Sequence, residues 1–577
     1  MDKHAVAIVL DEIGTLLELH GENKFKARAF TGAARAVERL EEELTTVARE
    51  GRLETISGVG PATAAVIREL INTGTSLYYQ QLRDRTPDGL LELLAVPRLG
   101  TGRIRTLHEE LGVATLDDLE RAARANRVAP LKGFGEKTQD RILEGIAYVR
   151  TIMGRRRYAE AIELGQRLRG FAAALPEVIR VELVGELRRG CETVNALVLA
   201  MAVEPEHADR TVEQFLNLPG IARAERHTHG ASARLSDGVQ LDLKVVPDDE
   251  FATAVLFATG SESHLARLRE RAQERSLELT AHGLFDHGAR LPLENEAAVY
   301  SALGLAFVEP ELRETGVEID AARSDALPAL ISYEDLRGCF HCHSNYSDGK
   351  ATIAEMAEAA HERGWRYLGI ADHSQFAGYA GGLSPDEIRA QHDEIDQWNR
   401  QHGKRLWILK GIEADILADG RLDYEDQPGI LASFDYVIGS VHSSFALPRE
   451  AQTQRFLRAI QNPYLTLLGH LTGRLLLSRK GYELDLAAIF SAAATRGIGI
   501  EINSDPHRME LDWRHWPAAK RLGIRTAINP DAHSPRQLDF VHYGTVIARK
   551  GWLEQKDVIN CWSLAEVKRF FQRTRKA

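Results

Sequence analysis

The sequence predicts a multidomain chain with an all-α amino-terminal region, an α+β middle and a carboxy-terminal region of repeated strand–helix units. Its 577 residues exceed the size of one domain and suggest about three or four. In residues 1–150, apolar side chains recur every three or four positions, the spacing of helices that pack on one another. From residue 336 onward, short apolar strands alternate with helices about seven times. This alternation predicts a parallel β/α sheet or barrel.

The composition is that of a globular protein. Hydrophobic residues make up 44% of the chain, and the net charge of −11 argues against a surface that is basic throughout. Local basic patches and backbone amides can still hold phosphates. The four cysteines, Cys191, Cys339, Cys342 and Cys561, are too few for a disulfide framework. With no signal peptide and no apolar run of about 18 residues, we expect a reduced, cytoplasmic monomer without membrane contact.

Three glycine-rich turns occur in the helical region, with the pattern of an apolar residue, any residue, Gly, any residue, Gly and a helix start. They contain Gly58 and Gly60, then Gly100, then Gly133 and Gly135, and the middle copy has Arg98 in place of its first glycine. Such a turn offers backbone N–H groups and the positive end of a helix dipole to a phosphate. The alternative, ordinary loops between helices, is weakened by the succession of three copies.

The middle of the chain changes to short β-rich runs between about residues 178 and 250. VIRVELVGEL, NALVLAMAV and VQLDLKVVP predict a sheet with helices packed on one face. Residues 250–325 return to helices and short strands. A proline-containing connector, RSDALPALISYEDLRG, then predicts a domain boundary.

Histidines and acids gather at the strand ends of the last region, where barrel active sites are built. They are His341, His343, Asp348, Asp372, His373, Glu413, His442, His470, Asp531 and His533. Because residues two apart in a strand share a face, His341 with His343 and Asp531 with His533 each present two ligands to one point. This set suits two or three divalent ions, Zn²⁺ or Mn²⁺, which ionise a water and stabilise a phosphoryl displacement. Scattered surface histidines are the alternative, and their number at strand ends argues against it.

A second motif overlaps the first histidine pair. Cys339-Phe340-His341-Cys342-His343 has the C-x-x-C-H spacing of haem attachment, and C-x-x-C also suits zinc. The absence of an export signal argues against haem. If both histidines face the site, Cys342 points away as a packing residue, while Cys339 stays open as an extra ligand or redox position.

These segments resemble the PHP (polymerase and histidinol phosphatase) domain family, notably His341–Gly349, Ala371–Ser374, Gly439–His442, Gly469–Leu475 and Asn529–Ser534. The resemblance implies a distorted (β/α)7 barrel with a trinuclear metal centre that hydrolyses phosphoesters. Its nine metal ligands match His341, His343, Asp348, His373, Glu413, His442, His470, Asp531 and His533. Of these, His341, His343, Glu413, Asp531 and His533 are the expected catalytic residues. Arg474 is the candidate phosphate-binding residue, with an ordinary surface arginine as the alternative.

The front half resembles the X-family DNA polymerases. The glycine-rich turns are similar to helix-hairpin-helix motifs, which hold DNA backbones without reading sequence. Val184–Val194 is similar to the nucleotidyltransferase signature, but Ala196 and Val198 stand where that family has its Asp-x-Asp pair. Glu186 replaces the serine that helps to bind the triphosphate, and Asp242 remains as the third carboxylate. Because one carboxylate cannot hold two Mg²⁺ ions, we expect neither Mg²⁺ binding at this palm nor significant template-directed synthesis.

The resemblance covers nearly the whole chain and implies five domains. Residues 1–80 form a helical DNA-end-binding domain with a helix-hairpin-helix, and 81–150 form a fingers-like helical domain. Residues 151–247 form a degenerate nucleotidyltransferase palm of α+β type, 248–325 a thumb-like domain, and 336–577 the PHP phosphoesterase domain. The family implies a 3′–5′ exonuclease in DNA repair, often with Mn²⁺, and in some members processing of abasic or 3′-phosphate ends.

The leading hypothesis is therefore a DNA end-processing phosphoesterase that acts on gapped or single-stranded ends, together with repair proteins. Three alternatives stay open: an X-family polymerase with residual gap-filling activity, a non-catalytic DNA-binding scaffold, and a small-molecule phosphoesterase. The full ligand set argues against the scaffold. The DNA-gripping turns argue against the small-molecule enzyme.

Overall fold

The computed structural model describes residues 1–577 except Asp2, Arg39, Glu41, Arg98, Pro219, His229, Ser236, Asp237, Pro428 and Ala577. Arg98, the atypical residue of the second glycine-rich turn, thus lies outside the described residues. The chain divides into two compact units, Met1–Met153 and Gly154–Ala577. Among the described residues, no helix combines the length and apolar character needed to cross a bilayer.

The first unit is built from helices, and its described residues form no strand. The helices are α1 (Lys3–Leu19), α2 (Lys24–Glu38), α3 (Leu44–Arg49), α4 (Pro61–Thr73), α5 (Leu77–Asp84), α6 (Thr101–Leu111), α7 (Leu116–Arg124) and α8 (Glu136–Ile152). Apolar faces of α1 to α5 enclose one core, and α6 to α8 enclose a second. The three- and four-residue spacing of the sequence therefore reports real helix packing.

Each glycine-rich turn leads directly into a helix. Gly60, Gly100 and Gly135 are the residues that cap the amino ends of α4, α6 and α8. Gly58 and Gly133 have φ angles of +94° and +85°, in the left-handed region that side chains with a Cβ rarely adopt. Glycine at these two positions is thus required by the turn itself.

The second unit begins with a five-stranded sheet of order β2-β4-β7-β6-β5. Its strands are β2 (Val178–Val184), β4 (Ala196–Val203), β5 (Ile221–His227), β6 (Gly230–Leu235) and β7 (Gln240–Val246). Only β4 and β7 are parallel. Helices α9 (Tyr158–Ala173) and α11 (Ala208–Leu216) pack on one face. Helix α12 (Phe251–Thr259) covers Ala200 and Ala202 on the other face, so helices lie on both faces of the sheet and not only on the one that the sequence indicated.

The next segment surrounds a small core of its own. Helices α12, α13 (Glu262–Glu274), α14 (Glu296–Ala302) and α15 (Val317–Arg323) enclose it together with an antiparallel sheet. That sheet consists of β8 (Leu277–Thr280), β9 (Gly283–Asp286) and β10 (Ala289–Arg290). Within the core, the buried His264 bonds Glu318 and Tyr300 through its two ring nitrogens.

The carboxy-terminal region is a seven-stranded parallel sheet whose order follows the chain. Its strands are β11 (Gly338–Cys339), β12 (Tyr367–Ile370), β13 (Trp407–Asp415), β14 (Tyr436–Ser440), β15 (Leu467–Leu468), β16 (Gly499–Asn503) and β17 (Thr526–Asn529). A parallel bridge between Cys342 and Ala532 brings the two edges together, with His343 N donating to Ala532 O at 2.8 Å. The result is a nearly closed barrel.

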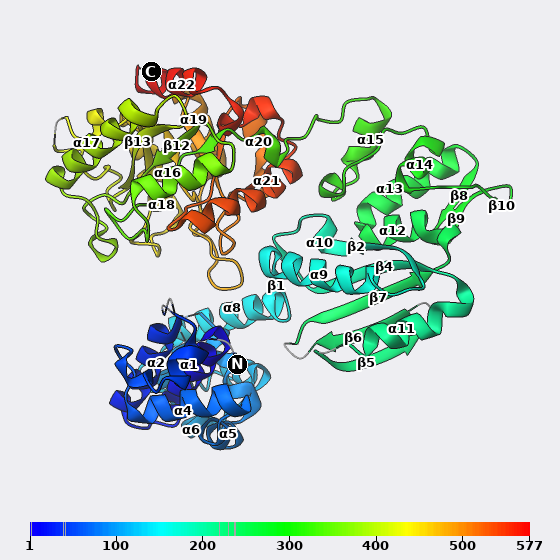
Figure 1. The fold of residues 1–577 in the computed structure, drawn as a ribbon, viewed down its shortest axis with the longest axis horizontal. Coiled ribbons are helices and arrows are strands. Elements are labelled where there is room, and N and C mark those ends of the chain that lie inside the picture. Colours follow the sequence, from blue (N-terminus) through cyan, green and yellow to red (C-terminus); the bar gives the residue numbers. More distant parts are fainter. Residues whose placement is uncertain are drawn as a thin grey trace. The chain divides into compact units, whose positions relative to one another are not determined.

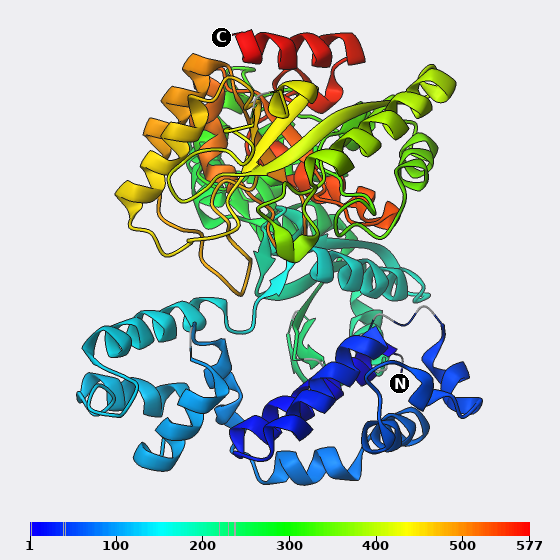
Figure 2. The same cartoon turned by 90° about the vertical axis from the view of Figure 1, so that its left-hand side faces the viewer.

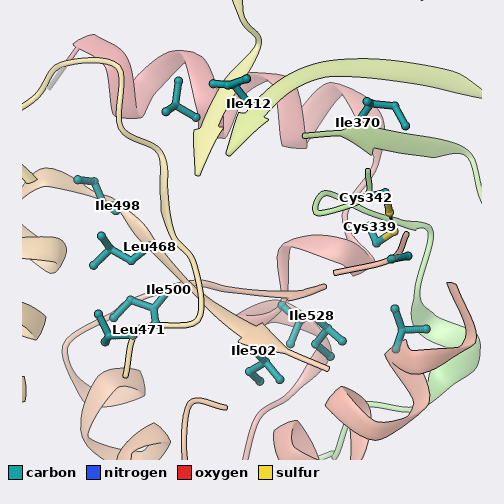
Figure 3. Packing of buried hydrophobic residues seen from close by; sticks show 14 of the residues in the cluster. Cys339, Cys342, Ile370, Ile412, Leu468, Leu471, Ile498, Ile500, Ile502 and Ile528 are labelled. Atoms are coloured by element: carbon teal, nitrogen blue, oxygen red, sulfur yellow. Dashed lines mark hydrogen bonds between the residues drawn. The ribbon is translucent and has the colours of Figure 1, made fainter. Parts of the chain in front are cut away.

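Helices connect the barrel strands and cover their outer face (Figure 1). They are α16 (Ile353–Glu362), α17 (Pro385–His402), α18 (Arg449–Ile460), α19 (Leu486–Arg496), α20 (Trp516–Arg521) and α21 (Val541–Lys550). Strand residues of one parity, such as Ile370, Ile412 and Ile500, face these helices (Figure 3). The opposite parity faces the barrel interior, as expected from the two-residue period of a strand.

Aromatic side chains fill the amino end of the barrel interior. Phe340, Tyr367 and Tyr436 form this layer together with Phe571 of α22 (Leu564–Lys576). Figure 2 shows α22, in red, lying at one end of the barrel. A Cβ at Gly369 or Gly411 would collide with the Tyr436 ring, so these glycines make room for it. The closed amino end leaves the carboxyl end for the polar residues.

The cysteine pair beside the first histidines belongs to the outer core. Cys339 and Cys342 are buried, with their sulfur atoms 3.4 Å apart among apolar side chains (Figure 3). The expectation that Cys342 points away from the histidines is confirmed. Cys339 lies in the same apolar cluster, so neither sulfur joins the ligand groups described below.

Candidate metal centre

The nine side chains selected as metal ligands converge at the carboxyl end of the barrel. His341, His343 and Asp348 follow β11, His373 follows β12, Glu413 lies in β13, His442 follows β14, His470 follows β15, and Asp531 and His533 follow β17. Parallel strands deliver the residues after their carboxyl ends to one rim, which is why positions 190 residues apart meet here.

Glu413 occupies the centre of the group. Its Oε1 lies 3.0 Å from His470 Nε2 and 3.3 Å from His442 Nε2. His341 Nε2 lies 3.3 Å from the same oxygen. The other oxygen, Oε2, lies 2.9 Å from His373 Nδ1. One carboxylate thus faces four imidazoles, the position of a group that bridges two cations.

Asp348 and Asp531 complete the other side of the group. His343 Nε2 lies 3.2 Å from Asp531 Oδ1, and His533 Nε2 lies 3.2 Å from Asp348 Oδ1. His373 Nε2 is 3.6 Å from Asp348 Oδ1, which links this side to Glu413. Three overlapping sets of ligand atoms follow, each within 4.8 Å: His343 with Asp348, His373 and His533; His341 with His343 and Glu413; and His373 with Glu413 and His442.

The spacing of the donor atoms suits coordination of divalent ions better than hydrogen bonding among the side chains themselves. A tetrahedral site with bonds of about 2.0 Å has ligand atoms about 3.3 Å apart, close to the spacings found here. His341 Nε2, His343 Nδ1 and Glu413 Oε2 are buried and accept or donate no hydrogen bond. Buried polar atoms are nearly always satisfied, so three unsatisfied atoms from residues of one ligand set fit a site for bound cations.

The electrostatics of the group favour ionised carboxylates. Burial opposes ionisation of Glu413, but the surrounding His442, His341 and His373 hold its pKa well below the usual value. Burial likewise lowers the pKa of His343, and the nearby His373 and His533 reinforce this, to about 3. Burial would lower the pKa of His442 too, but Glu413 and Asp415 raise it to about 10. Charge within the group is thus strongly coupled, as in a cluster built for cations.

A buried carboxylate that sequence reasoning missed orients two ligands. Glu501 in β16 accepts a hydrogen bond from His341 Nδ1 at 2.7 Å and from the backbone N of His470 at 2.7 Å. Asn529 Nδ2 donates to it at 3.0 Å. The available signal was an acidic residue inside the apolar run GIEIN, at the parity that faces the interior. Such partners fix the ring orientation and tautomer of a metal-binding histidine.

Asp372, which the sequence places beside His373, has a different role from its neighbour. Its carboxylate accepts from Ser344 Oγ at 2.6 Å and from Gln391 Nε2 at 2.6 Å. Burial raises its pKa. Asp372 therefore holds the loop that follows His343 rather than a cation. Asp415 similarly supports His442, with its Oδ1 3.2 Å from Nδ1.

The candidate phosphate-binding Arg474 is already engaged elsewhere. Its Nε donates to Arg508 O at 2.9 Å, and a further nitrogen donates to Met509 O. Its role toward phosphate stays a prediction. The arginine that lies beside the group is Arg508, whose Nε is 3.8 Å from Asp531 Oδ2. Arg474 thus holds the backbone that carries Arg508.

The three palm positions of the family's carboxylates lie on two neighbouring strands, and only Asp242 has a side-chain oxygen. Val198 lies opposite Asp242 in the parallel β4–β7 register. Asp242 Oδ1 accepts from Ser232 Oγ at 2.7 Å and from Gln240 Nε2 at 3.1 Å. Glu186 lies 3.0 Å from Arg155 Nη2 and accepts from the backbone N of Asn195 at 2.7 Å. Asp242, the remaining carboxylate, and Glu186 therefore both bond to groups of the palm itself.

The signature loop of the palm contacts the barrel. Glu192 Oε1 lies 3.5 Å from Arg474 Nη2 and 3.8 Å from Arg514 Nη1. From α21, the buried Lys550 donates to Arg189 O at 2.9 Å and pairs with Glu314. These residues of the loop are thus engaged with residues of the barrel.

Family comparisons agree with this architecture. The model of a helix-hairpin-helix domain matches residues 1–76. The model of a SAM-like helix-hairpin-helix tandem matches residues 90–147. A DNA polymerase beta thumb matches 254–314, and a PHP domain matches 340–505. The fold and the histidine-rich centre define an X-family polymerase architecture with a PHP domain at its carboxyl side. The chain belongs to the PolX family of such proteins.

Individual relatives cover either nearly the whole chain or about a third of it. The DNA polymerase/3′-5′ exonuclease PolX of Bacillus subtilis (strain 168) is 35% identical over 579 residues, which span 99% of this chain and 100% of the relative. A probable phosphatase of Thermoanaerobacter sp. (strain X514) is 29% identical over 206 residues, 33% of this chain and 77% of the relative. A probable phosphatase of Vibrio vulnificus (strain YJ016) is 26% identical over 205 residues, 33% of this chain and 76% of the relative.

Proposed function

We propose that this chain is a 3′–5′ exonuclease that uses Mn²⁺ or Zn²⁺ to process gapped or single-stranded DNA ends in repair. The observation that carries the proposal is the convergence of nine ligand side chains around Glu413. The exonuclease activity for which the Bacillus subtilis relative is named supports the reaction. The helix starts after Gly60, Gly100 and Gly135 support DNA as the substrate, because the first turn of a helix suits backbone phosphates.

The position of each residue in the ligand group indicates its role in the proposed reaction. When bound, divalent ions activate a water and stabilise negative charge on the phosphoryl oxygens. Glu413 and Asp531 supply the buried negative charge that holds such ions, and the histidines fix their places. Asp348 and His533 are the most exposed of the nine, at 37% and 30%, so they mark the side on which the DNA phosphate enters. Arg508 lies beside Asp531 and is the cation best placed to attract that phosphate.

The exonuclease is tested by removing two ligands together. We expect His341→Ala His343→Ala to lower Mn²⁺-dependent shortening of a 3′-terminated single strand by at least about 1,000-fold, because both residues bind in one ligand set. A labelled oligonucleotide assay measures this. His227→Ala His287→Ala, two exposed positions outside the barrel, is the matched control. Equal shortening by the ligand variant and the control would refute the proposal.

A related reaction of the same site is 3′-phosphate removal. Relatives named probable phosphatases match about a third of the chain, which supports hydrolysis of a terminal phosphomonoester as a second activity. An oligonucleotide ending in a 3′-phosphate should release inorganic phosphate before it is shortened. Shortening without a free phosphate phase would leave the exonuclease as the only activity.

We further infer that template-directed synthesis is lost or severely impaired. Val198 and Ala196 offer no oxygen to a metal, and Asp242 is bonded to Ser232 and Gln240. Glu186 adds an anion where the family binds a triphosphate, so nucleotide binding is opposed as well. In the His341→Ala His343→Ala background, which prevents masking by degradation, we expect no primer extension with Mg²⁺ or Mn²⁺. Extension that Asp242→Asn abolishes would contradict this inference.

A further inference from the structure

Two aromatic side chains stand exposed on the loop that follows a metal-ligand position. Phe376 and Tyr379 are 54% and 75% exposed, on the segment between His373 and α17. Leu522 is the only other large apolar side chain with such exposure among the described residues of the barrel region, 336–576. Aromatic rings bury large areas when they are used for packing, so two exposed rings on one short loop indicate a ligand surface.

Hydrogen bonds to residues outside the loop hold its backbone in place. The backbone N of Phe376 donates to Asp423 Oδ2 at 2.7 Å, and that of Gln375 donates to Tyr424 OH at 2.7 Å. Tyr424 is itself buried and bonds Leu383 O. The two exposed rings therefore project from a fixed backbone, and a ligand that stacks on them would meet little cost of ordering.

The same loop lies beside the ligand cluster. The Tyr379 ring centroid is 6.3 Å from the ring centroid of His373, which faces both Glu413 and Asp348. Leu383 N donates to His373 O at 3.0 Å, so the loop returns to the ligand after carrying the aromatic residues outward. A group stacked on Tyr379 would thus be next to the phosphate that the cluster receives.

We propose that Phe376 and Tyr379 form a stacking platform for the unpaired nucleobases at the 3′ end of a single strand. The inference rests on the proposed exonuclease function and names how its substrate is held. Base–aromatic stacking is sequence-tolerant, because every base has a π-face, and contributes about 1–3 kcal/mol per base. Paired bases within a duplex keep their faces covered, so the platform selects frayed or single-stranded ends.

The test compares normal and base-less ends. Two labelled strands of one sequence are used, one intact and one with abasic residues at its last two 3′ positions. Fluorescence anisotropy with Ca²⁺ in place of Mn²⁺ measures their Kd. We expect the wild-type protein to bind the intact end about tenfold or more tightly than the abasic end. Phe376→Ala Tyr379→Ala should bring the two Kd values together, and Tyr379→Phe should retain the preference.

Controls separate the platform from a general defect. Phe171→Ala removes a phenylalanine of similar exposure, 55%, from helix α9 and should leave the preference intact. Equal Kd values for both ends in the wild type, or an equal loss for both in the double variant, would overturn the platform. If Mn²⁺ supports degradation of neither strand, the exonuclease proposal fails, while the difference in Kd still decides the platform on its own.

Discussion

At the scale of single residues, the candidate metal centre depends on carboxylates that orient the ligand histidines and are not ligands themselves. Glu501 accepts hydrogen bonds from a His341 ring nitrogen and from the His470 backbone, and Asp415 supports His442. The nine ligands could be predicted because they follow strand ends in a recognisable order. Glu501 could not, since one acid inside an apolar strand is identified only when the register of β16 against β17 is known.

Replacing Glu501 should weaken metal binding without removing a ligand. In Glu501→Gln the amide loses the charge that balances His341, so we expect the affinity for Mn²⁺ or Zn²⁺ to fall about 10- to 100-fold. Isothermal titration of the metal-stripped protein measures the change. Asp419→Asn, which alters an exposed acid paired with Arg421, is the control and should bind normally. Unchanged affinity in Glu501→Gln would mean that the carboxylate serves the fold alone.

At the scale of elements, a strand could be recognised in the sequence where its apolar residues contrast with polar neighbours. Strands of the barrel are short, only Leu467–Leu468 for β15, yet their apolar character and terminal histidines made them readable. The hairpin of β5 and β6 was missed, because IARAERH is rich in charged residues and lies largely exposed at the sheet edge. Edge strands bury little, so their sequences carry a weak signal.

The glycine-rich turns give a prediction at this scale. Gly133 has a φ of +85° with open space around it, so Gly133→Ala should cost about 1–2 kcal/mol through backbone strain alone. Gly102 lies in α6 with equally open space, and Gly102→Ala should stabilise the helix by about 0.5–1 kcal/mol. Urea unfolding of both variants measures the difference. Equal changes in the free energy of unfolding for the two variants would show that the turn tolerates a side chain.

At the scale of the whole molecule, the cluster joins distant parts of the chain. Ligands from six of the seven barrel strands meet at Glu413 and its neighbours, so cations bound there would link segments from residue 341 to residue 533. The class of site followed from the sequence alone. The position of Arg508 beside Asp531 did not, because it depends on how the 508–512 loop folds back.

Chelation should therefore reveal the barrel as a separate melting transition. A ligand that binds only the folded state stabilises it by about 2.7 kcal/mol at 100 times its Kd. We expect chelation to lower the Tm of the barrel transition by several degrees and restored Mn²⁺ to raise it again. Differential scanning calorimetry measures both steps. His341→Ala His343→Ala should show no metal-dependent shift, and an equal shift in that variant would contradict cation binding at this site.

The contact between the signature loop and the barrel changes what mutagenesis of the palm can report. A substitution at Glu192, the kind normally chosen to ask about nucleotide transfer, also alters a group that meets Arg474 and Arg514. A substitution at Arg189 removes the side chain that pairs with Glu314, the partner of Lys550. Because Arg474 holds the Arg508 backbone, a Glu192 variant would also disturb the rim of the candidate metal centre and be misread as communication between two sites. Asp242, whose bonds stay within the palm sheet, is the position at which the question can be asked cleanly.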